Sequence, residues 1–317
     1  MKKIDRAVKV AFEKCLAVKR NENVLVVTDD ANLEAGRVLY CAARPLCHDA
    51  VLMTMPEREN NGQEPPDEVA AAMLKSDAVF LATTKSLSHT RARKNASKSG
   101  ARIASMPGIT LDMMSRTLDV DYGRMESDGR RLCKILNGAS EISIKTFLGT
   151  DLTFSIRGRR AEPDTGIIPY PGGFTNLPAG EVYLAPVEGT ARGRLVVDGS
   201  IGDTGLLKKP IEIAISDGFA EGMRGGREAR NLWNILSVHG KLAFNVAEFG
   251  IGINPRAEIT GNILEDEKAL TTIHIAFGDN SGFGGRISVP SHQDGIIRDP
   301  SVWVDGKQLM NKGKLKI

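Results

Sequence analysis

The chain has 317 residues, of which 41% are hydrophobic and 26% charged, and its 42 basic and 39 acidic side chains leave a formal net charge of +3. This balance, together with an aromatic content of 5%, argues against a nucleic-acid surface built from a basic stripe or from stacking rings. Because there is no run of about 18 apolar residues, and because Asp5, Lys9 and Glu13 interrupt any signal-peptide core, we expect a cytoplasmic protein without a membrane span, whose four cysteines are reduced and mostly buried.

Strand-like and helix-like segments alternate over the first 140 residues. Buried-strand patterns occur at 23–30, 50–55, 78–84 and 101–108, and helical patterns at 33–46, 67–76 and 86–100. This alternation predicts parallel strands with crossover helices, in a Rossmann-like α/β domain over residues 1–140. No GxGxxG follows the first strand, so no dinucleotide-binding residues are assigned. Asp29, Asp30 and His89 follow predicted strands, where helix capping competes with a ligand-binding role.

The rest of the chain predicts a mostly β domain over residues 141–317. The segment "EISIKTFLGTDLTFSIRG" at 141–158 indicates a hairpin that turns at "GTD", and Asp305–Gly306 indicates another. Further short strand patterns follow one another, and a helix at 226–238 interrupts them.

Three residues near the C-terminal end have side chains that can bind a metal. In "TTIHIAFG", a period of two places His274 on the opposite face from Ile273 and Ile275, among small residues. In "SHQDG", His292 and Asp294 have the same parity, so an extended chain points both to one side. Each signal is weak alone, because a strand histidine is usually structural and a polar turn is common.

Two glutamates occupy apolar surroundings. Glu181 opens the strand-like "EVYLAP", and Glu248 interrupts "LAFNVAEFGIG", where a buried carboxylate is costly unless it is paired or bound to a metal. An exposed strand face or a salt bridge is the alternative, and the acidic run 265–267 reads as the first turn of a helix. With the two histidines and Asp294, the glutamates make enough nitrogen and oxygen donors for a two-metal hydrolytic site.

Four segments resemble the thermophilic metalloprotease family of aminopeptidases T and S, also called leucyl aminopeptidases: "NLPAGEVYLAP", "AEFGIGINP", "EDEKALTTIHIAFGDN" and "SHQDG". The resemblance is clearest over residues 145–305. It implies a homodimer whose second domain holds one or two divalent ions, zinc or cobalt. The metal ligands it implies are Glu181, Glu248, His274, His292 and Asp294.

Two features depart from that family. Ser281 stands where the aminopeptidases have a catalytic tyrosine, and only 17 residues separate His274 from His292. A related branch of the same fold contains an iron-dependent dioxygenase that opens dihydroxypyridine rings. Its set of two histidines and one carboxylate could be supplied by His274, His292 and Asp294.

The leading interpretation is a metal-dependent aminopeptidase, in which a metal-activated water attacks the first peptide bond of a small peptide. Glu248 and Glu188 are its candidate general bases. One alternative is an Fe(II)-dependent ring-cleaving dioxygenase of the dihydroxypyridine type. The other is a non-catalytic protein that binds a metal or a metabolite.

Overall fold

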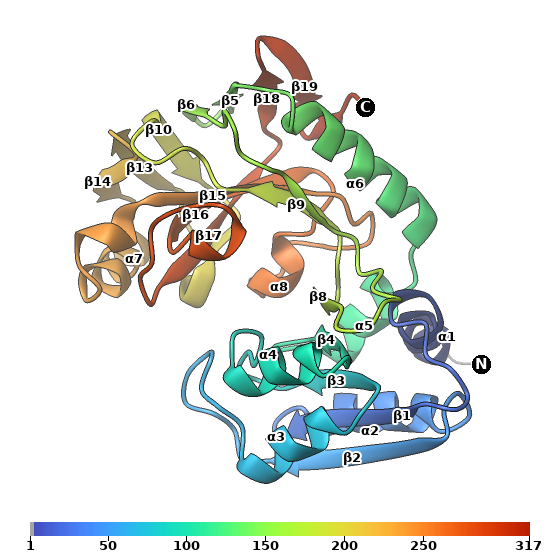
Figure 1. Cartoon of the computed structure of the whole chain (residues 1–317). Coiled ribbons are helices and arrows are strands. Elements are labelled where there is room, and N and C mark those ends of the chain that lie inside the picture. The colour runs from blue at the N-terminus through green and yellow to red at the C-terminus, as the bar shows by residue number, and fades with distance from the viewer. Residues whose placement is uncertain (1–2) are drawn as a thin grey trace. The chain divides into compact units, whose positions relative to one another are not determined.

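The computed structural model describes residues 3–317, which divide into two compact units (Figure 1). The first contains the described residues up to 122 together with 165–179, and the second contains 123–164 and 180–317. The chain therefore crosses between units at 122–123, 164–165 and 179–180, and not at one boundary near residue 140. The mixed α/β class expected from the sequence is confirmed.

The first unit contains one parallel sheet with the strand order β2-β1-β3-β4-β8. Its strands are β1 (Asn23–Asp29), β2 (Asp49–Met55), β3 (Ala78–Ala82), β4 (Arg102–Ser105) and β8 (Phe174–Asn176). Its helices are α1 (Lys3–Val10), a short π-helix (Ala11–Cys15), α2 (Leu33–Ala43), α3 (Asp67–Leu74), α4 (Arg91–Lys98) and α5 (Leu111–Thr117). Strand residues such as Leu25, Leu81 and Ile103 pack with Met73 of α3 and Ala96 of α4, which accounts for the nearly continuous apolar strand runs.

The second unit contains two antiparallel sheets. The larger has the order β14-β13-β10-β6-β5-β18-β19-β20. Its strands are β5 (Glu141–Lys145), β6 (Asp151–Ser155), β10 (Arg192–Val197), β13 (Ile211–Ser216), β14 (Phe219–Arg224), β18 (Ser301–Val304), β19 (Lys307–Asn311) and β20 (Lys314–Leu315). The predicted hairpins are confirmed, although the first turns at residues 146–150 because Asp151 already pairs with Lys145. Both Asp305 and Gly306 have positive φ, as a two-residue turn requires.

The second sheet of this unit has the order β12-β11-β17-β16-β15-β9-β7. Its strands are β7 (Glu162–Asp164), β9 (Glu181–Leu184), β11 (Ser200–Ile201), β12 (Gly205–Leu206), β15 (Val246–Gly252), β16 (Thr272–Gly278) and β17 (His292–Arg298). The helices of the unit are α6 (Tyr122–Leu136, in this unit from Gly123 on), α7 (Arg227–Ser237) and α8 (Ile263–Asp266). The helix predicted at 226–238 is confirmed as α7, whereas α5 and α6 lie in a stretch to which the sequence patterns assign no element.

The two sheets of the second unit pack face to face through apolar side chains. The rings of Phe154 on β6 and Phe249 on β15 have centroids 5.6 Å apart. Phe249 pairs with Ile275, and Ile275 pairs with Gly295, which lies against Val197 of β10. These residues share one face of the second sheet, so Glu248 and His274, which neighbour them in sequence, point to its other face.

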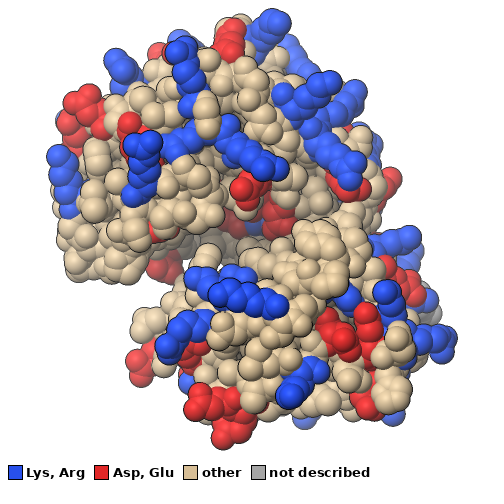
Figure 2. Space-filling model, viewed as in Figure 1, with Lys and Arg blue, Asp and Glu red and all other residues tan. Residues whose placement is uncertain are grey.

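Other expectations about the whole chain can be compared with the structure. Among residues 3–317, no helix is both long and apolar enough to cross a membrane. All four cysteines are free thiols, but Cys15 alone is buried, so the expectation of mostly buried thiols is wrong. Basic and acidic side chains are interspersed on the face shown in Figure 2.

Candidate metal centre

Five side chains that could bind a metal gather on one face of the second sheet of the second unit. Glu181 begins β9, Glu248 lies on β15, His274 on β16, and His292 and Asp294 on β17. These strands are consecutive neighbours in the sheet. The structure therefore brings together all five residues that the sequence analysis singles out as metal ligands.

Strand register explains why they meet. His274 pairs with Gly250 across β15 and β16, and Ala276 pairs with Asp294 across β16 and β17. A shift in register between Val246 and Glu248 indicates a β-bulge beside the glutamate. Bulges re-aim side chains and are common next to active sites.

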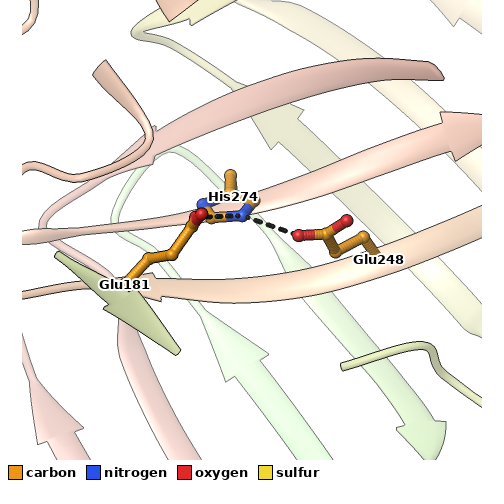
Figure 3. Close-up of side chains that lie close together, drawn as sticks. All are labelled: Glu181, Glu248 and His274. Atoms are coloured by element: carbon orange, nitrogen blue, oxygen red, sulfur yellow. Dashed lines mark hydrogen bonds and ion pairs between the residues drawn. The ribbon is translucent and has the colours of Figure 1, made fainter. Parts of the chain in front are cut away.

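His274 lies between two glutamates, as Figure 3 shows. Its Nε2 is 3.4 Å from Glu181 Oε2 and 3.3 Å from Glu248 Oε1, and its side chain is fully buried. The imidazole lies over Gly250, where an added Cβ would collide with Nε2 and Cε1. Gly250 therefore leaves the space that the imidazole occupies.

His292 is oriented by the backbone. Its Nδ1 is 2.8 Å from the carbonyl oxygen of Asp279, so Nδ1 carries the proton that it donates. Its Nε2 lies 3.3 Å from Glu248 Oε2 and 3.4 Å from Asp294 Oδ1. This arrangement of a backbone acceptor at one nitrogen and carboxylates at the other is typical of a metal-binding histidine.

The carboxylates and imidazoles strongly shift one another's pKa values. Burial by itself lowers the pKa of His274, but the hydrogen bond to Glu248 and the charge of Glu181 outweigh it and raise that pKa to about 9. The pKa of His292 is likewise raised, because Asp294 and Glu248 overcome the effect of burial. For Asp294, burial opposes ionisation, yet the charge and hydrogen bond of His292 lower its pKa to about 2. The carboxylates of the site thus stabilise a positive charge that lies among them.

A divalent cation fits this donor set. The donors form two overlapping groups that share Glu248: Glu181, Glu248 and His274 in one, and Glu248, His292 and Asp294 in the other. Glu181 Oε2 is buried without a hydrogen-bond partner, although it faces the cluster. Nitrogen and oxygen donors of this kind suit iron, zinc and cobalt alike.

A buried lysine beside the cluster was missed by the sequence analysis. Lys268 is fully buried, and its Nζ lies 2.9 Å from Glu181 Oε1 and also contacts Glu267. Although burial lowers the pKa of Lys268, the charges of Glu181 and Glu267 outweigh it, and the net shift is upward. Burial also raises the pKa of Glu267 to about 8. The expectation that Glu267 belongs to the first turn of a helix is wrong, because α8 ends at Asp266.

Glu188, a candidate general base, is not in either group of metal-binding side chains. Its carboxylate pairs with Arg159 and accepts hydrogen bonds from Asn280 Nδ2 at 3.0 Å and from the backbone N–H of Arg286 at 2.7 Å. Burial opposes ionisation of Glu188, but these donors prevail and lower its pKa. Glu188 therefore anchors the loop 279–291, which also supplies the carbonyl that orients His292.

Ser281, which stands at the position of the aminopeptidase tyrosine, is exposed and bonds to Asp279 through its hydroxyl at 3.1 Å. Two residues later, the ring of Phe283 makes edge-on contacts with His292 and with Tyr183, at centroid distances of 6.0 and 5.7 Å. The loop thus carries an aromatic side chain against His292, one of the candidate metal ligands.

The candidate ligand residues of the first unit are one buried aspartate and two exposed side chains. Asp29 is buried and accepts hydrogen bonds from the backbone N–H groups of Thr84 at 2.5 Å and Asn32 at 3.1 Å, so it ties together the segments that follow β1 and β3. Asp30 and His89 are exposed.

Two comparisons with known proteins point to the same family. A family model of 2,5-dihydroxypyridine 5,6-dioxygenase matches residues 3–317. The 2,5-dihydroxypyridine 5,6-dioxygenase of Pseudomonas putida is 26% identical over 265 residues, which cover 77% of this chain and 73% of that protein.

Two solved structures share the fold. The 2,5-dihydroxypyridine dioxygenase of Pseudomonas putida KT2440 superposes with a TM-score of 0.83 at 18% identity, covering 100% of this chain and 98% of that one. Wild-type AmpT of Thermus thermophilus gives a TM-score of 0.73 at 17% identity, with 99% of each chain covered. At these identities the likeness establishes the fold alone.

The expected aminopeptidase activity is wrong, and with it the description of the chain as a hydrolase, because the match over residues 3–317 and the curated relative are both dioxygenases. The protein is an enzyme, and the chain belongs to the 2,5-dihydroxypyridine 5,6-dioxygenase family.

Proposed function

We propose that this enzyme uses Fe(II) and molecular oxygen to open the ring of a dihydroxylated pyridine. The observation that carries the proposal is the family match over residues 3–317. The named activity of the Pseudomonas putida relative supplies the substrate class. The cluster of imidazoles and carboxylates on β9, β15, β16 and β17, which is buried except at β17, supports it, because such donors suit iron.

The residues that would hold the ion are His274, His292 and Asp294, on the adjacent strands β16 and β17. Two imidazoles and one carboxylate form the ligand set of many iron oxygenases. Bound there, a ferrous ion would supply the redox chemistry by which oxygen reacts with the ring.

In this proposal Glu248 is a proton acceptor and not a metal ligand. Its two oxygens lie 3.3 Å from the Nε2 atoms of His274 and His292, so a substrate at the ion would lie within reach of this carboxylate. Glu248 Oε would accept the proton that a substrate hydroxyl gives up. Holding that proton beside the site makes the ring more electron-rich, and thus more reactive towards oxygen.

Oxygen consumption by the iron-loaded protein tests the proposal. The purified chain is loaded with Fe(II) without air, and 2,5-dihydroxypyridine is added together with labelled oxygen gas. We expect oxygen uptake that matches substrate loss, with both atoms of one oxygen molecule in the ring-opened product. The matched control is His239→Ala, which alters a histidine outside the cluster.

A protein that retains iron yet consumes neither oxygen nor any dihydroxylated pyridine would refute this function. It would instead favour the remaining alternative, a non-catalytic metal- or metabolite-binding protein.

A further inference from the structure

A cavity of about 490 Å³ lies on the second unit, apart from the candidate metal centre. Three segments line it: the turn 156–159 that follows β6, the residues that follow β9, and the loop 279–291. None of the described residues that line it is a candidate metal ligand. Its volume lies within the range of roughly 300–1,000 Å³ that is usual for sites that bind small molecules.

Positive charge dominates the lining of this cavity. Among the lining residues that the structure describes, three are arginines, Arg157, Arg159 and Arg286, and one is a carboxylate, Glu188, so the net charge of the lining is +2. Like charges around one concavity repel one another, and the field between its low-dielectric walls raises the local concentration of ions of the opposite sign. The cavity therefore favours an anionic ligand.

Glu188 cannot neutralise all three arginines, because both of its oxygens are already engaged. Oε2 pairs with Arg159, while Oε1 accepts hydrogen bonds from Asn280 Nδ2 at 3.0 Å and from the backbone N–H of Arg286 at 2.7 Å. The ion pair is largely shielded from water, since the side chains of Arg159 and Glu188 are 11% and 19% exposed. This pair belongs to the wall of the cavity and leaves the other two guanidinium groups without a carboxylate.

The guanidinium groups of Arg157 and Arg286 are accessible to a ligand. Both residues are exposed, and within residues 3–317 neither guanidinium has a hydrogen bond or an ion pair. Each can therefore bind a carboxylate through two parallel N–H groups, a geometry that a guanidinium offers and an ammonium does not. Two such groups at one cavity suit a ligand with two carboxylates.

Backbone hydrogen bonds hold the arginines of the turn 156–159 in place. The N–H of Arg159 donates to the carbonyl of Ile156 at 2.9 Å, and the N–H of Arg157 donates to Ser155 Oγ at 3.2 Å. The N–H of Val187 donates to the carbonyl of Ser155 at 2.8 Å, which joins the end of β6 to the segment that follows β9. The backbone of the cavity is thus formed in advance, which lowers the entropic cost of binding a ligand.

We propose that this cavity binds a small dicarboxylate, with Arg157 and Arg286 as its two anchoring cations. Val187 and Ile287, which are half-buried in the lining, would contact the carbon chain of the ligand. An inorganic anion such as phosphate has no carbon chain, so these apolar side chains favour the organic anion. The site is additional to the metal centre of the proposed function and does not depend on the reaction there.

Isothermal titration calorimetry of the metal-free chain with sodium succinate tests the site. Wild type, Arg157→Gln, Arg286→Gln and the double variant are compared at one ionic strength, because salt screens exposed charges. Glutamine keeps part of the side chain and removes its charge. We expect one succinate per chain in wild type, a loss of affinity of about tenfold or more in each single variant, and no measurable binding in the double variant.

Two controls separate a specific site from a general attraction to basic side chains. Arg160→Gln removes an exposed arginine that is next to the turn but outside the cavity lining, so this variant should bind succinate as wild type does. Succinamide, in which neutral amides replace both carboxylates, should not bind. Circular dichroism checks that each variant is folded, which we expect because the substituted guanidinium groups have no bonds within the described residues.

Several outcomes would overturn the proposal. Succinate that does not bind at millimolar concentration would do so, and so would equal affinity in wild type and the double variant. If the double variant is unfolded, the two single variants decide by the same criterion. Inorganic phosphate is titrated in parallel, and phosphate that binds more tightly than succinate would contradict a dicarboxylate site. Because iron and a pyridine are absent from these titrations, failure of the dioxygenase assay leaves the result unaffected.

Discussion

Gly250 sets the position of the His274 imidazole. The two residues are paired across β15 and β16, and the imidazole occupies the space where any side chain at position 250 would begin. The requirement is steric, since an added Cβ would overlap the ring nitrogen that faces the two glutamates.

Gly250→Ala should therefore displace the imidazole and abolish stoichiometric metal binding. Overpacking should also lower the free energy of unfolding by about 1–3 kcal/mol. Metal analysis and denaturant titration measure the two effects. Gly222→Ala on β14 is the matched control, because nothing lies near its added Cβ. Full metal content in Gly250→Ala would show that the imidazole is not confined in this way.

Glu248→Gln separates a proton acceptor from a metal ligand. If Glu248 accepts the substrate proton, the variant should keep its iron while kcat falls by about 10²- to 10⁴-fold. Iron content and oxygen uptake are measured on the same sample. Glu212→Gln, at an exposed position on β13, should change neither. Loss of iron in Glu248→Gln would make Glu248 a ligand instead.

The raised pKa of His274 predicts how metal binding depends on pH. In the metal-free protein this pKa is about 9, above the ordinary value of roughly 6.5 for an unfolded chain. Protonation of His274 therefore stabilises the metal-free fold fully below roughly pH 6.5, and this stabilisation is lost as the pH rises through about 9. A metal requires the neutral imidazole, so it must displace this proton at lower pH.

The rise in Tm on adding Zn²⁺ should consequently be greater at pH 9 than at pH 6. Differential scanning fluorimetry of metal-free and metal-loaded protein across this range measures it. A rise that stays constant or shrinks with increasing pH would contradict the assigned direction of the shift.

For single residues, the sequence revealed which side chains could bind a metal but not which side chains surround them. His274 could be predicted because alternation along a strand is visible in one short segment, "TTIHIAFG". The position of Lys268 could not be predicted, because it depends on the contact with Glu181, which is far away in the chain and meets the lysine only in the fold. The contacts of Glu188 could not be predicted for the same reason, since its partners Arg159, Asn280 and Arg286 are distant in sequence.

Among the elements, the loop 279–291 links strand β16 to strand β17 and orients His292 through the carbonyl of Asp279. Buried Asn280 holds the loop from within, by accepting from the backbone N–H of Ile287 at 2.9 Å. Glu188 holds it from outside, through Asn280 and Arg286. The loop is thus held in place beside the candidate metal centre.

Glu188→Gln should loosen this loop and weaken metal binding by about 10- to 100-fold, as is usual when a group supporting a ligand is lost. The ion pair with Arg159 is lost, although the amide can still accept from Asn280. Competition with a coloured chelator measures the Kd, and Glu221→Gln, at an exposed position on β14, is the control. An unchanged Kd would show that the loop holds its shape without this anchor.

Elements with local signals were predictable, and those that depend on tertiary pairing were not. The hairpins at 146–150 and 305–306 have turn residues whose backbone preferences are local. Strand β8 has only three residues and exists because β4 pairs with it. The bulge beside Glu248 likewise reflects the register between β15 and β16, which no single segment encodes.

For the whole molecule, the homodimer and the small-molecule substrate implied by the sequence stay predictions. Sedimentation equilibrium at several concentrations tests the first, since a dimer should have twice the mass of the 34.2 kDa chain. A species of 34.2 kDa throughout would refute it.

The three crossings between units have a consequence for the order in which the protein can fold as it is made. The sheet of the first unit is completed at one edge by β8, which leaves the ribosome only after the β5–β6 hairpin of the second unit. Until residue 176 has been synthesised, β4 has an unpaired edge that can associate with other chains. A fragment that stops near residue 140 would keep that edge open permanently, so the first unit depends on residues 165–179 for a complete sheet.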